Sequence, residues 1–303
     1  MKLFGTDGVR GKAGEKLSAA TSMRLAMAAG IYFRQFASHT NTILLGKDTR
    51  RSGYMIETAI VAGLTAVGYN VRQIGPMPTP AIAFLTEDMR CDAGIMISAS
   101  HNPAEYNGIK FLDRDGCKLS DESELAIEEY LGDNLTDDWR PTGASIGEIR
   151  QMPHLVHSYV ERLASLLPHA EAIPMKIAFD CAHGAAGAVM PALLERIGSR
   201  WPLIGADPDG LNINEGVGVI HMRHLGNYVT EYACDMGFAF DGDADRALMT
   251  DSGGRLIDGD IAIWVLARWL SKKGMLGSGV VVTVMSNMAL EEHLGIGSSD
   301  DDR

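Results

Sequence analysis

Short apolar runs alternate along the chain with longer segments in which apolar residues recur every three or four positions. The segment 54–67 has this helical spacing, and one face of it consists of Ile56, Ile60, Leu64 and Val67. Further helices are expected at 154–166, 185–197 and 260–273. The apolar runs predict strands at 43–45, 71–74, 93–98, 109–112, 176–179, 237–240 and 280–284. Apolar strands that alternate with helices predict an α/β fold, with parallel or mixed sheets sandwiched by helices.

Length and polar stretches predict several such α/β domains in series. At 303 residues the chain is longer than a typical single core allows. The polar, Gly- and Pro-containing stretch 136–153 suggests a boundary, which gives a first domain over 1–150 and a second over 151–252.

The remaining residues, 253–303, follow a hairpin-like turn at 251–254. They contain two predicted helices and one predicted strand, which cannot close a sheet. We therefore expect an incomplete third domain that ends in a disordered tail over 297–303.

Composition narrows the range of partners and compartments. The formal net charge of −12 argues against a nucleic-acid surface and against an anionic membrane as partner. The chain has no apolar stretch of the roughly 18 residues that a membrane span needs, and its first residues lack the apolar run of a signal peptide. The four cysteines include no C-x-x-C pair, so neither a zinc site nor a disulfide framework is expected. We expect a cytoplasmic protein.

The strongest chemical signal is the run DGDADR, in which Asp241, Asp243 and Asp245 follow a predicted strand at alternate positions. Bringing such carboxylates within about 5 Å costs roughly 3 kcal/mol per pair at an effective dielectric of 20. A hard cation such as Mg²⁺ would relieve that repulsion. A solvated acidic turn is the alternative, but small spacers directly after an apolar strand favour a metal site. An EF-hand is excluded, because Arg246 and Ser252 stand where its loop needs Gly and Glu.

A second signal is SASHNP at 98–103, followed by NGIK at 107–110. Ser100 could simply cap a turn after the strand. Alternatively, its hydroxyl, the imidazole of His101 and the ammonium of Lys110 could converge, which would suit phosphoryl transfer.

Two basic, Gly-flanked loops are weaker signals. GTDGVRG at 5–11 contains Arg10, and GKDTRRSG at 46–53 contains Arg50 where a strand gives way to a helix. Free N–H groups at such a helix start favour anions, although structural salt bridges explain arginines of this kind at least as often. The chain contains neither a P-loop nor a dinucleotide-binding G-x-G-x-x-G, so neither kind of nucleotide site is supported.

In this order, GTDGVRG, GKDTRRSG, SASHNP with NGIK, and DGDADR resemble the α-D-phosphohexomutase superfamily, from Phe4 to about Leu294. GTDGVRG and the segment 75–81 are most similar to the branch that interconverts glucosamine 6-phosphate and glucosamine 1-phosphate for bacterial cell-wall precursors. The resemblance implies a phosphorylated amino sugar as partner.

The resemblance also implies roles for individual residues. Ser100 would carry a phosphate and pass it to the sugar by way of a bisphosphate. That phosphate and the carboxylates of Asp241, Asp243 and Asp245 would hold one Mg²⁺. Arg10 and Lys110 would lie near the phosphoserine, with Lys110 as a proton shuttle, and His101 would support the same loop. Arg246 would orient the metal loop or a phosphate, and Arg50 is a further candidate for binding substrate or phosphate.

The chain departs from the pattern in two respects. Tyr106 stands where the glucosamine branch usually has Asp, and tyrosine there is more familiar in phosphomannomutases and phosphoglucomutases of the same superfamily. The superfamily's later Gly-Glu-x-Ser-Gly-His and Arg-x-Ser-Gly-Thr-Glu loops, which read the sugar and its distal phosphate, do not occur. Relative to the family, the chain is thus expected to be truncated at its C-terminus and to show negligible mutase turnover by itself.

Two other functions remain as alternatives. A haloacid-dehalogenase-type phosphatase also has D-x-D after a strand; Asp241 would then be the nucleophile, although Asp245 replaces the usual Thr or Val. The chain could also be an inactive remnant or a module that only binds sugar phosphates.

Overall fold

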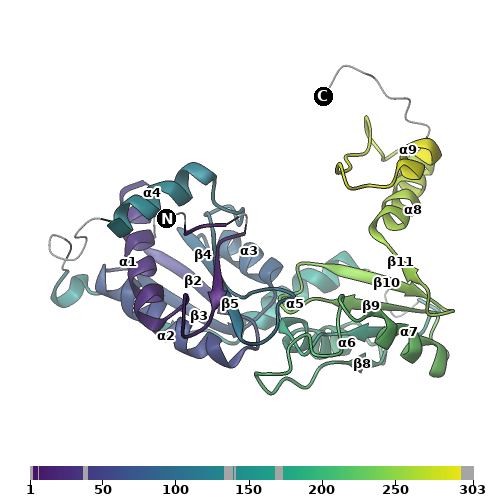
Figure 1. Ribbon diagram of the computed structural model, residues 1–303, viewed down its shortest axis with the longest axis horizontal. Helices are drawn as coiled ribbons and strands as arrows, with labels where there is room; N and C mark the ends of the chain where they lie inside the picture. Colours follow the sequence, from purple (N-terminus) through teal and green to yellow (C-terminus); the bar gives the residue numbers. More distant parts are fainter. Residues whose placement is uncertain are drawn as a thin grey trace.

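The computed structural model describes residues 3–5, 7–36, 40–132, 139, 141–167 and 173–294. Two mixed β-sheets, each covered by helices, lie side by side and are connected through helix α5 (Leu155–Leu166) (Figure 1). The first sheet and its helices are called the first lobe, and the second sheet and its helices the second lobe. The α/β architecture expected from the sequence is confirmed.

The first sheet has the strand order β1-β5-β4-β2-β3-β6. Its strands are β1 (Val9–Lys12), β2 (Thr42–Lys47), β3 (Asn70–Pro76), β4 (Ala93–Ile97), β5 (Tyr106–Leu112) and β6 (Ile149–Gln151). Strand β2 pairs in parallel with β3 and β4, whereas β5 is antiparallel to β4 and β1. The whole of β4 is buried, as a strand covered on both faces should be.

Successive side chains of β2 point to opposite faces of the sheet, so each face has its own core. Ile43 and Leu45 belong to the cluster under α1 (Ala19–Phe36), α2 (Arg51–Ala66) and α4 (Asp121–Gly132). Leu44 belongs to a second cluster, under α3 (Thr79–Asp88) and α5. This second cluster continues into the other lobe through α6 (Met190–Arg196), so one hydrophobic core joins the two lobes.

The second sheet has the order β11-β10-β9-β7-β8. Its strands are β7 (Ile177–Asp180), β8 (Leu203–Ile204), β9 (Met236–Phe240), β10 (Ala247–Asp251) and β11 (Leu256–Ile257). Helix α7 (Met222–Glu231) packs Leu225 and Val229 against Ala239 of β9. Strand β9 is parallel to β7 and antiparallel to β10, and its carboxyl end carries the DGDADR run.

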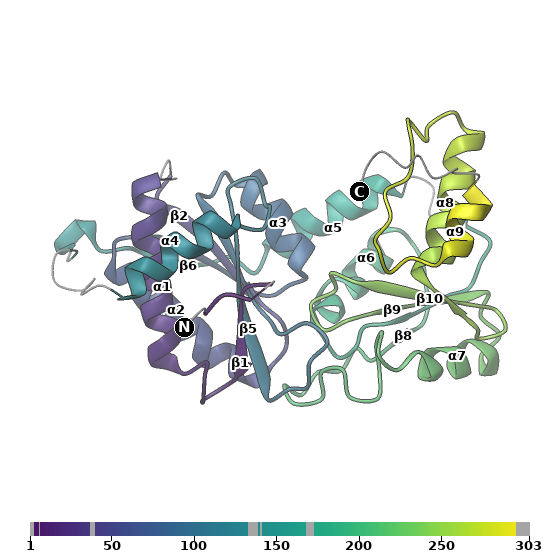
Figure 2. The ribbon, with the colours of Figure 1, turned by 45° about the horizontal axis from the view of Figure 1, so that its top comes forward.

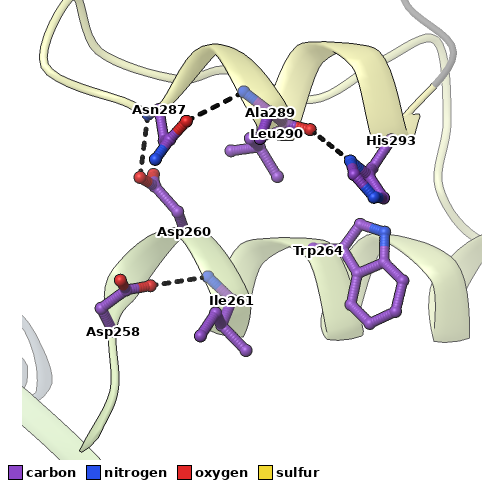
Figure 3. A pocket seen from close by; sticks show the side chains of 8 residues that line it. All are labelled: Asp258, Asp260, Ile261, Trp264, Asn287, Ala289, Leu290 and His293. Atoms are coloured by element: carbon purple, nitrogen blue, oxygen red, sulfur yellow. Dashed lines mark hydrogen bonds between the residues drawn. The ribbon is translucent and has the colours of Figure 1, made fainter.

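Two further helices, α8 (Gly259–Lys272) and α9 (Met288–Leu294), follow β11 in the chain and lie next to each other above β9 and β10 in Figure 2. The Asp258 carboxylate caps α8 by accepting the Ile261 N–H at 3.0 Å. The two helices face each other across a pocket of about 400 Å³ (Figure 3). Its lining includes Trp264, which contacts the His293 ring edge-on with 6.4 Å between centroids.

The prediction of a strand at 280–284 is wrong. These residues form no strand, and Val281 is 97% exposed. An apolar run becomes a strand only where a neighbouring strand accepts and donates its backbone hydrogen bonds, and no strand among the described residues pairs with this segment.

The helix predicted at 185–197 is interrupted. A short 3₁₀ turn, Ala185–Ala188, precedes α6, which starts at Met190. Pro191 explains the break, because its ring nitrogen has no hydrogen to donate to the preceding turn. The divisions at 150/151 and 252/253 stay predictions, and the tail predicted at 297–303 lies outside the described residues.

The close packing of α1 on α2 can be tested at Gly63. A Cβ there would come 2.4 Å from the Met23 carbonyl oxygen. Gly63→Ala should therefore destabilise the protein by about 1–3 kcal/mol, despite the better helix propensity of alanine. The matched control is Gly259→Ala in α8, where a Cβ would meet nothing within 4 Å. Urea unfolding should show a lower midpoint for the first variant alone; equal midpoints would contradict the packing.

Candidate active site

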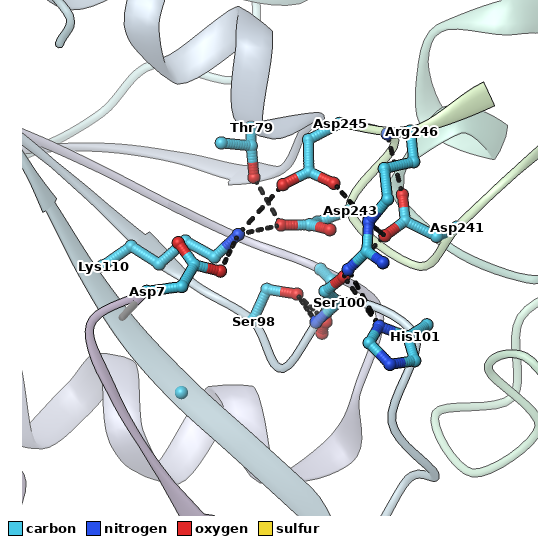
Figure 4. A network of polar contacts seen from close by, with 12 residues as sticks. Asp7, Thr79, Ser98, Ser100, His101, Lys110, Asp241, Asp243, Asp245 and Arg246 are labelled. Carbon is cyan, nitrogen blue, oxygen red and sulfur yellow. Dashed lines mark hydrogen bonds and ion pairs between the residues drawn. The ribbon is translucent and has the colours of Figure 1, made fainter. Parts of the chain in front are cut away.

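The two loops singled out in the sequence meet between the lobes. The 98–103 loop follows β4 and the 241–246 loop follows β9, so both leave the carboxyl end of a strand, where open α/β sheets place their sites. The Ser100 hydroxyl donates a 2.5 Å hydrogen bond to Oδ2 of Asp241 (Figure 4). A serine and a carboxylate that lie 141 residues apart in the chain are thus in direct contact.

Ser100 has a left-handed backbone conformation, with φ of 55°. This is uncommon for a residue other than glycine and requires support from its surroundings. The Ser98 hydroxyl provides one support, since its oxygen accepts the Ser100 N–H at 2.9 Å while it donates to Asp48 at 2.7 Å. The Ser100 carbonyl provides the others, because it accepts from Arg50 at 2.9 Å and from Asn214 of the second lobe at 3.0 Å.

Arg246 contacts Ser100 from the second lobe. Its Nη2 donates to the Ser100 hydroxyl oxygen at 2.6 Å and lies 2.8 Å from Nδ1 of His101. Burial, followed by the positive charges of Arg246 and Arg10, holds the pKa of His101 below its usual value. The imidazole is therefore neutral at pH 7 and can accept the arginine's hydrogen bond.

The three aspartates form one cluster of oxygen ligands. Asp241, Asp243 and Asp245 each offer an oxygen within 4.8 Å of the others, and the first two are fully buried. Burial and the charge of Asp243 raise the pKa of Asp241 to about 6, against the hydrogen bond from Ser100, which lowers it. The Oδ1 atom of Asp243 is buried with no hydrogen-bond partner. A buried orphan oxygen beside two further carboxylates fits a hard cation such as Mg²⁺.

Lys110 lies among carboxylates from both lobes. Its Nζ is 2.9 Å from Asp243, 3.1 Å from Asp245 and 3.1 Å from Asp7. Burial alone would lower the pKa of Lys110, but the charges of Asp243 and Asp245 raise it above the usual value. The side chain is therefore an ammonium in this arrangement.

Arg10 and Arg50 occupy different surroundings. Arg10 forms an ion pair with Asp7 and, with Lys16 and Arg246, lines a polar cavity of about 420 Å³. Arg50 is fully buried, and its guanidinium donates to Asp48 and to the carbonyls at 100, 102 and 103. This burial favours a role for Arg50 in holding the Ser100 loop; phosphate binding by Arg50 stays a prediction.

The sequence reasoning missed four residues that the structure brings to the site. They are Asp7, Thr79, Ser98 and Asn214. Asp7, Thr79 and Ser98 lie in segments that the sequence analysis singled out, but a sequence pattern does not show which side chains meet in the fold.

Residues 1–137 match the family described as "Phosphoglucomutase/phosphomannomutase, alpha/beta/alpha domain I", and residues 157–254 match its "domain II". The phosphoglucosamine mutase of Campylobacter curvus (strain 525.92) is 54% identical over 297 residues, which cover 97% of this chain and 66% of the relative. The chain belongs to the phosphoglucomutase/phosphomannomutase family. The phosphoglucosamine mutase of Sulfurovum sp. (strain NBC37-1) gives the same identity and coverage. The chain spans about 66% of the length of these relatives.

Solved structures of the phosphoglucomutase/phosphomannomutase family share the fold. A family protein from Burkholderia thailandensis superposes with a TM-score of 0.74 at 25% identity, covering 90% of this chain and 59% of that one. The resemblance inferred from the four motifs is confirmed. Within the described ranges, no helix combines the length and apolar character needed to cross a membrane.

The raised pKa of Asp241 predicts how metal-free stability depends on pH. Between about pH 4 and pH 6 the folded protein keeps a proton on Asp241 that the unfolded chain releases. The contribution of Asp241 to the free energy of unfolding is therefore complete below this pH window and is lost as the pH rises through it. In EDTA, Asp241→Asn should therefore gain stability relative to wild type as the pH rises from 4 to 7, by on the order of 2 kcal/mol.

Chemical denaturation at several pH values measures that difference. Asp251→Asn is the control: the hydrogen bond from Arg255 lowers the pKa of this half-buried carboxyl, so its difference from wild type should not rise with pH over the same range. If the stability difference between Asp241→Asn and wild type does not change with pH, the pKa of Asp241 is not raised in the folded protein.

Proposed function

We propose that this chain carries the phosphoserine and metal centres of a phosphoglucosamine mutase, which interconverts glucosamine 6-phosphate and glucosamine 1-phosphate. The observation that carries the proposal is the direct hydrogen bond between the Ser100 hydroxyl and Asp241 of the acidic cluster. Family membership and the identity to phosphoglucosamine mutases support it. The substrate would be a phosphorylated amino sugar, and the compartment the cytoplasm.

Ser100 would be the residue that gives and takes the phosphoryl group. In the forward step the bond between Ser100 Oγ and phosphorus breaks and a bond forms from phosphorus to a sugar oxygen. The Lys110 ammonium would give a proton to the departing Ser100 oxygen and take up the proton of the sugar hydroxyl in its place. The bisphosphorylated sugar would then reorient in the site and transfer its other phosphoryl group to the Ser100 oxygen. Arg246, which already donates to Ser100 Oγ, would face the phosphate oxygens and stabilise their charge.

The carboxylates of Asp241, Asp243 and Asp245 would hold Mg²⁺ together with the phosphate on Ser100. When bound, the ion supplies positive charge that neutralises the transferring group. Lys110, between Asp243, Asp245 and Asp7, holds its ammonium at the edge of the same cluster. Arg10 lines the adjoining polar cavity, where it could face the phosphate of an entering sugar.

Tyr106 supports a second candidate within the same family, a phosphomannomutase or phosphoglucomutase, because it stands where the glucosamine branch usually has Asp. The haloacid-dehalogenase alternative is set aside, since the chain belongs to a different family. A remnant that only binds sugar phosphates would fail to take up a phosphoryl group, which the next experiment measures.

Ser100→Ala should abolish transfer of ³²P from labelled glucosamine 1,6-bisphosphate to the protein. His101→Ala should only slow the transfer, because Arg246 still contacts the Ser100 hydroxyl oxygen. Ser120→Ala, which removes an exposed hydroxyl elsewhere in the first lobe, is the control and should label like wild type. Phosphopeptide mapping should find the label on Ser100, and label on Asp241 would overturn the proposal.

Mg²⁺ should raise the thermal unfolding midpoint of the wild-type protein. Binding to the folded state alone contributes about 2.7 kcal/mol at a free concentration 100 times the dissociation constant. Asp243→Asn should lose the shift. Asp251→Asn should keep it, because Asp251 is a half-buried aspartate of β10 outside the acidic cluster. Differential scanning fluorimetry in EDTA and in excess Mg²⁺ gives the comparison; an equal shift in Asp243→Asn would place the ion elsewhere.

A further inference from the structure

Thr79 reaches from the first lobe to Asp243 in the second lobe with two hydrogen bonds. Its hydroxyl donates to Asp243 Oδ2 at 2.6 Å, and its N–H donates to the Asp243 carbonyl at 2.9 Å (Figure 4). The first bond fixes the carboxylate and the second fixes the backbone of the same residue. No step in the proposed reaction uses Thr79.

The local sequence explains why Thr79 can make both bonds. It is the first residue of α3, and N–H groups in the first turn of a helix have no partner within that helix. Pro78 and Pro80 restrict the backbone on either side, and the β-branched side chain has few rotamers. The hydroxyl and the N–H of Thr79 are therefore held in a fixed orientation that faces the 241–246 loop.

The two carboxylate oxygens of Asp243 differ in their hydrogen bonds. Oδ2 accepts from Thr79 and from Lys110, at 2.6 and 2.9 Å. Oδ1 accepts from nothing, although the side chain is fully buried. When two donors hold one oxygen of a carboxylate, the direction of its other oxygen is fixed as well. Figure 4 shows this second oxygen of Asp243 on the side of Asp241, away from Lys110.

We propose that Thr79 is a positioning residue for the metal ligand Asp243: it holds Oδ2 and thereby aims Oδ1 at the cation. This inference rests on the metal centre of the proposed function. Because Thr79 and Asp243 belong to different lobes, the same contact makes cation affinity depend on how the two lobes meet. Residues that orient metal ligands typically change affinity by about 10–100-fold when they are removed.

The test is the Mg²⁺ dissociation constant of the whole chain, measured by titration calorimetry. Thr79→Val keeps the branched shape and removes the hydroxyl, so binding should weaken by about 10–100-fold. Thr79→Ser keeps the hydroxyl and should stay within about threefold of wild type. Thr86→Val is the matched control in the same helix: its buried hydroxyl donates to the Ile82 carbonyl and does not touch the cluster, so affinity should not change.

Thermal unfolding in EDTA separates positioning from folding. A role in stability alone would lower the metal-free midpoint of Thr79→Val while leaving its Mg²⁺ affinity equal to that of Thr86→Val, and that result would overturn the inference. If Thr79→Val does not fold, Thr79→Ala takes its place with the same expected loss of affinity. If wild type binds Mg²⁺ and Thr79→Val or Thr79→Ala binds it equally well, this inference is wrong and the proposed metal centre stands. If wild type does not bind Mg²⁺, the metal centre of the proposed function is wrong as well.

Discussion

The site depends on one electrostatic constraint: two fully buried aspartates, Asp241 and Asp243, and a third beside them must share a small volume. Their mutual repulsion and their loss of water have to be offset by groups on neighbouring elements. Lys110 on β5 contributes an ammonium, Arg246 a guanidinium, and Ser100 and Thr79 contribute hydroxyl donors. Burial, followed by the charge of Asp243, still raises the pKa of Asp241 above its usual value, and a bound cation would oppose both effects.

This constraint explains why the two lobes are joined so closely. Ser100, Lys110 and Thr79 belong to the first lobe, whereas the aspartates and Arg246 belong to the second. Each lobe alone would therefore lack the partners that the other lobe supplies. The core cluster that runs from β2 through α3 and α5 to α6 fixes the lobes relative to each other. Asn214 adds a polar contact across the boundary at the strained Ser100 loop. Hydrophobic packing and polar contacts therefore both hold the two lobes together next to the site.

Much of this arrangement could be predicted from the sequence. Continuous apolar runs located β2, β4 and β9, whose side chains are buried or half-buried, and the loops that follow these strands contain most residues of the site. The run at 280–284 has the same apolar character yet forms no strand, since strand formation depends on a neighbour that a local pattern cannot reveal. Thr79 and Asn214 escaped notice for a related reason: their roles consist of contacts with residues 164 and 114 positions away. For Arg50 the sequence left both phosphate binding and a structural role open, and only the fold shows that its buried guanidinium donates to the backbone carbonyls of the Ser100 loop.

The central claim is that a phosphate on Ser100 and the three aspartates bind one shared cation. The most direct measurement places Mn²⁺ in the site of protein phosphorylated on Ser100 and records ³¹P coupling to the metal by pulsed electron–nuclear double resonance. The account predicts a strong ³¹P coupling, as for a phosphate oxygen bound directly to the ion, that disappears when Ser100 is dephosphorylated. Tight binding of Mn²⁺ to the aspartates with no ³¹P coupling would contradict it.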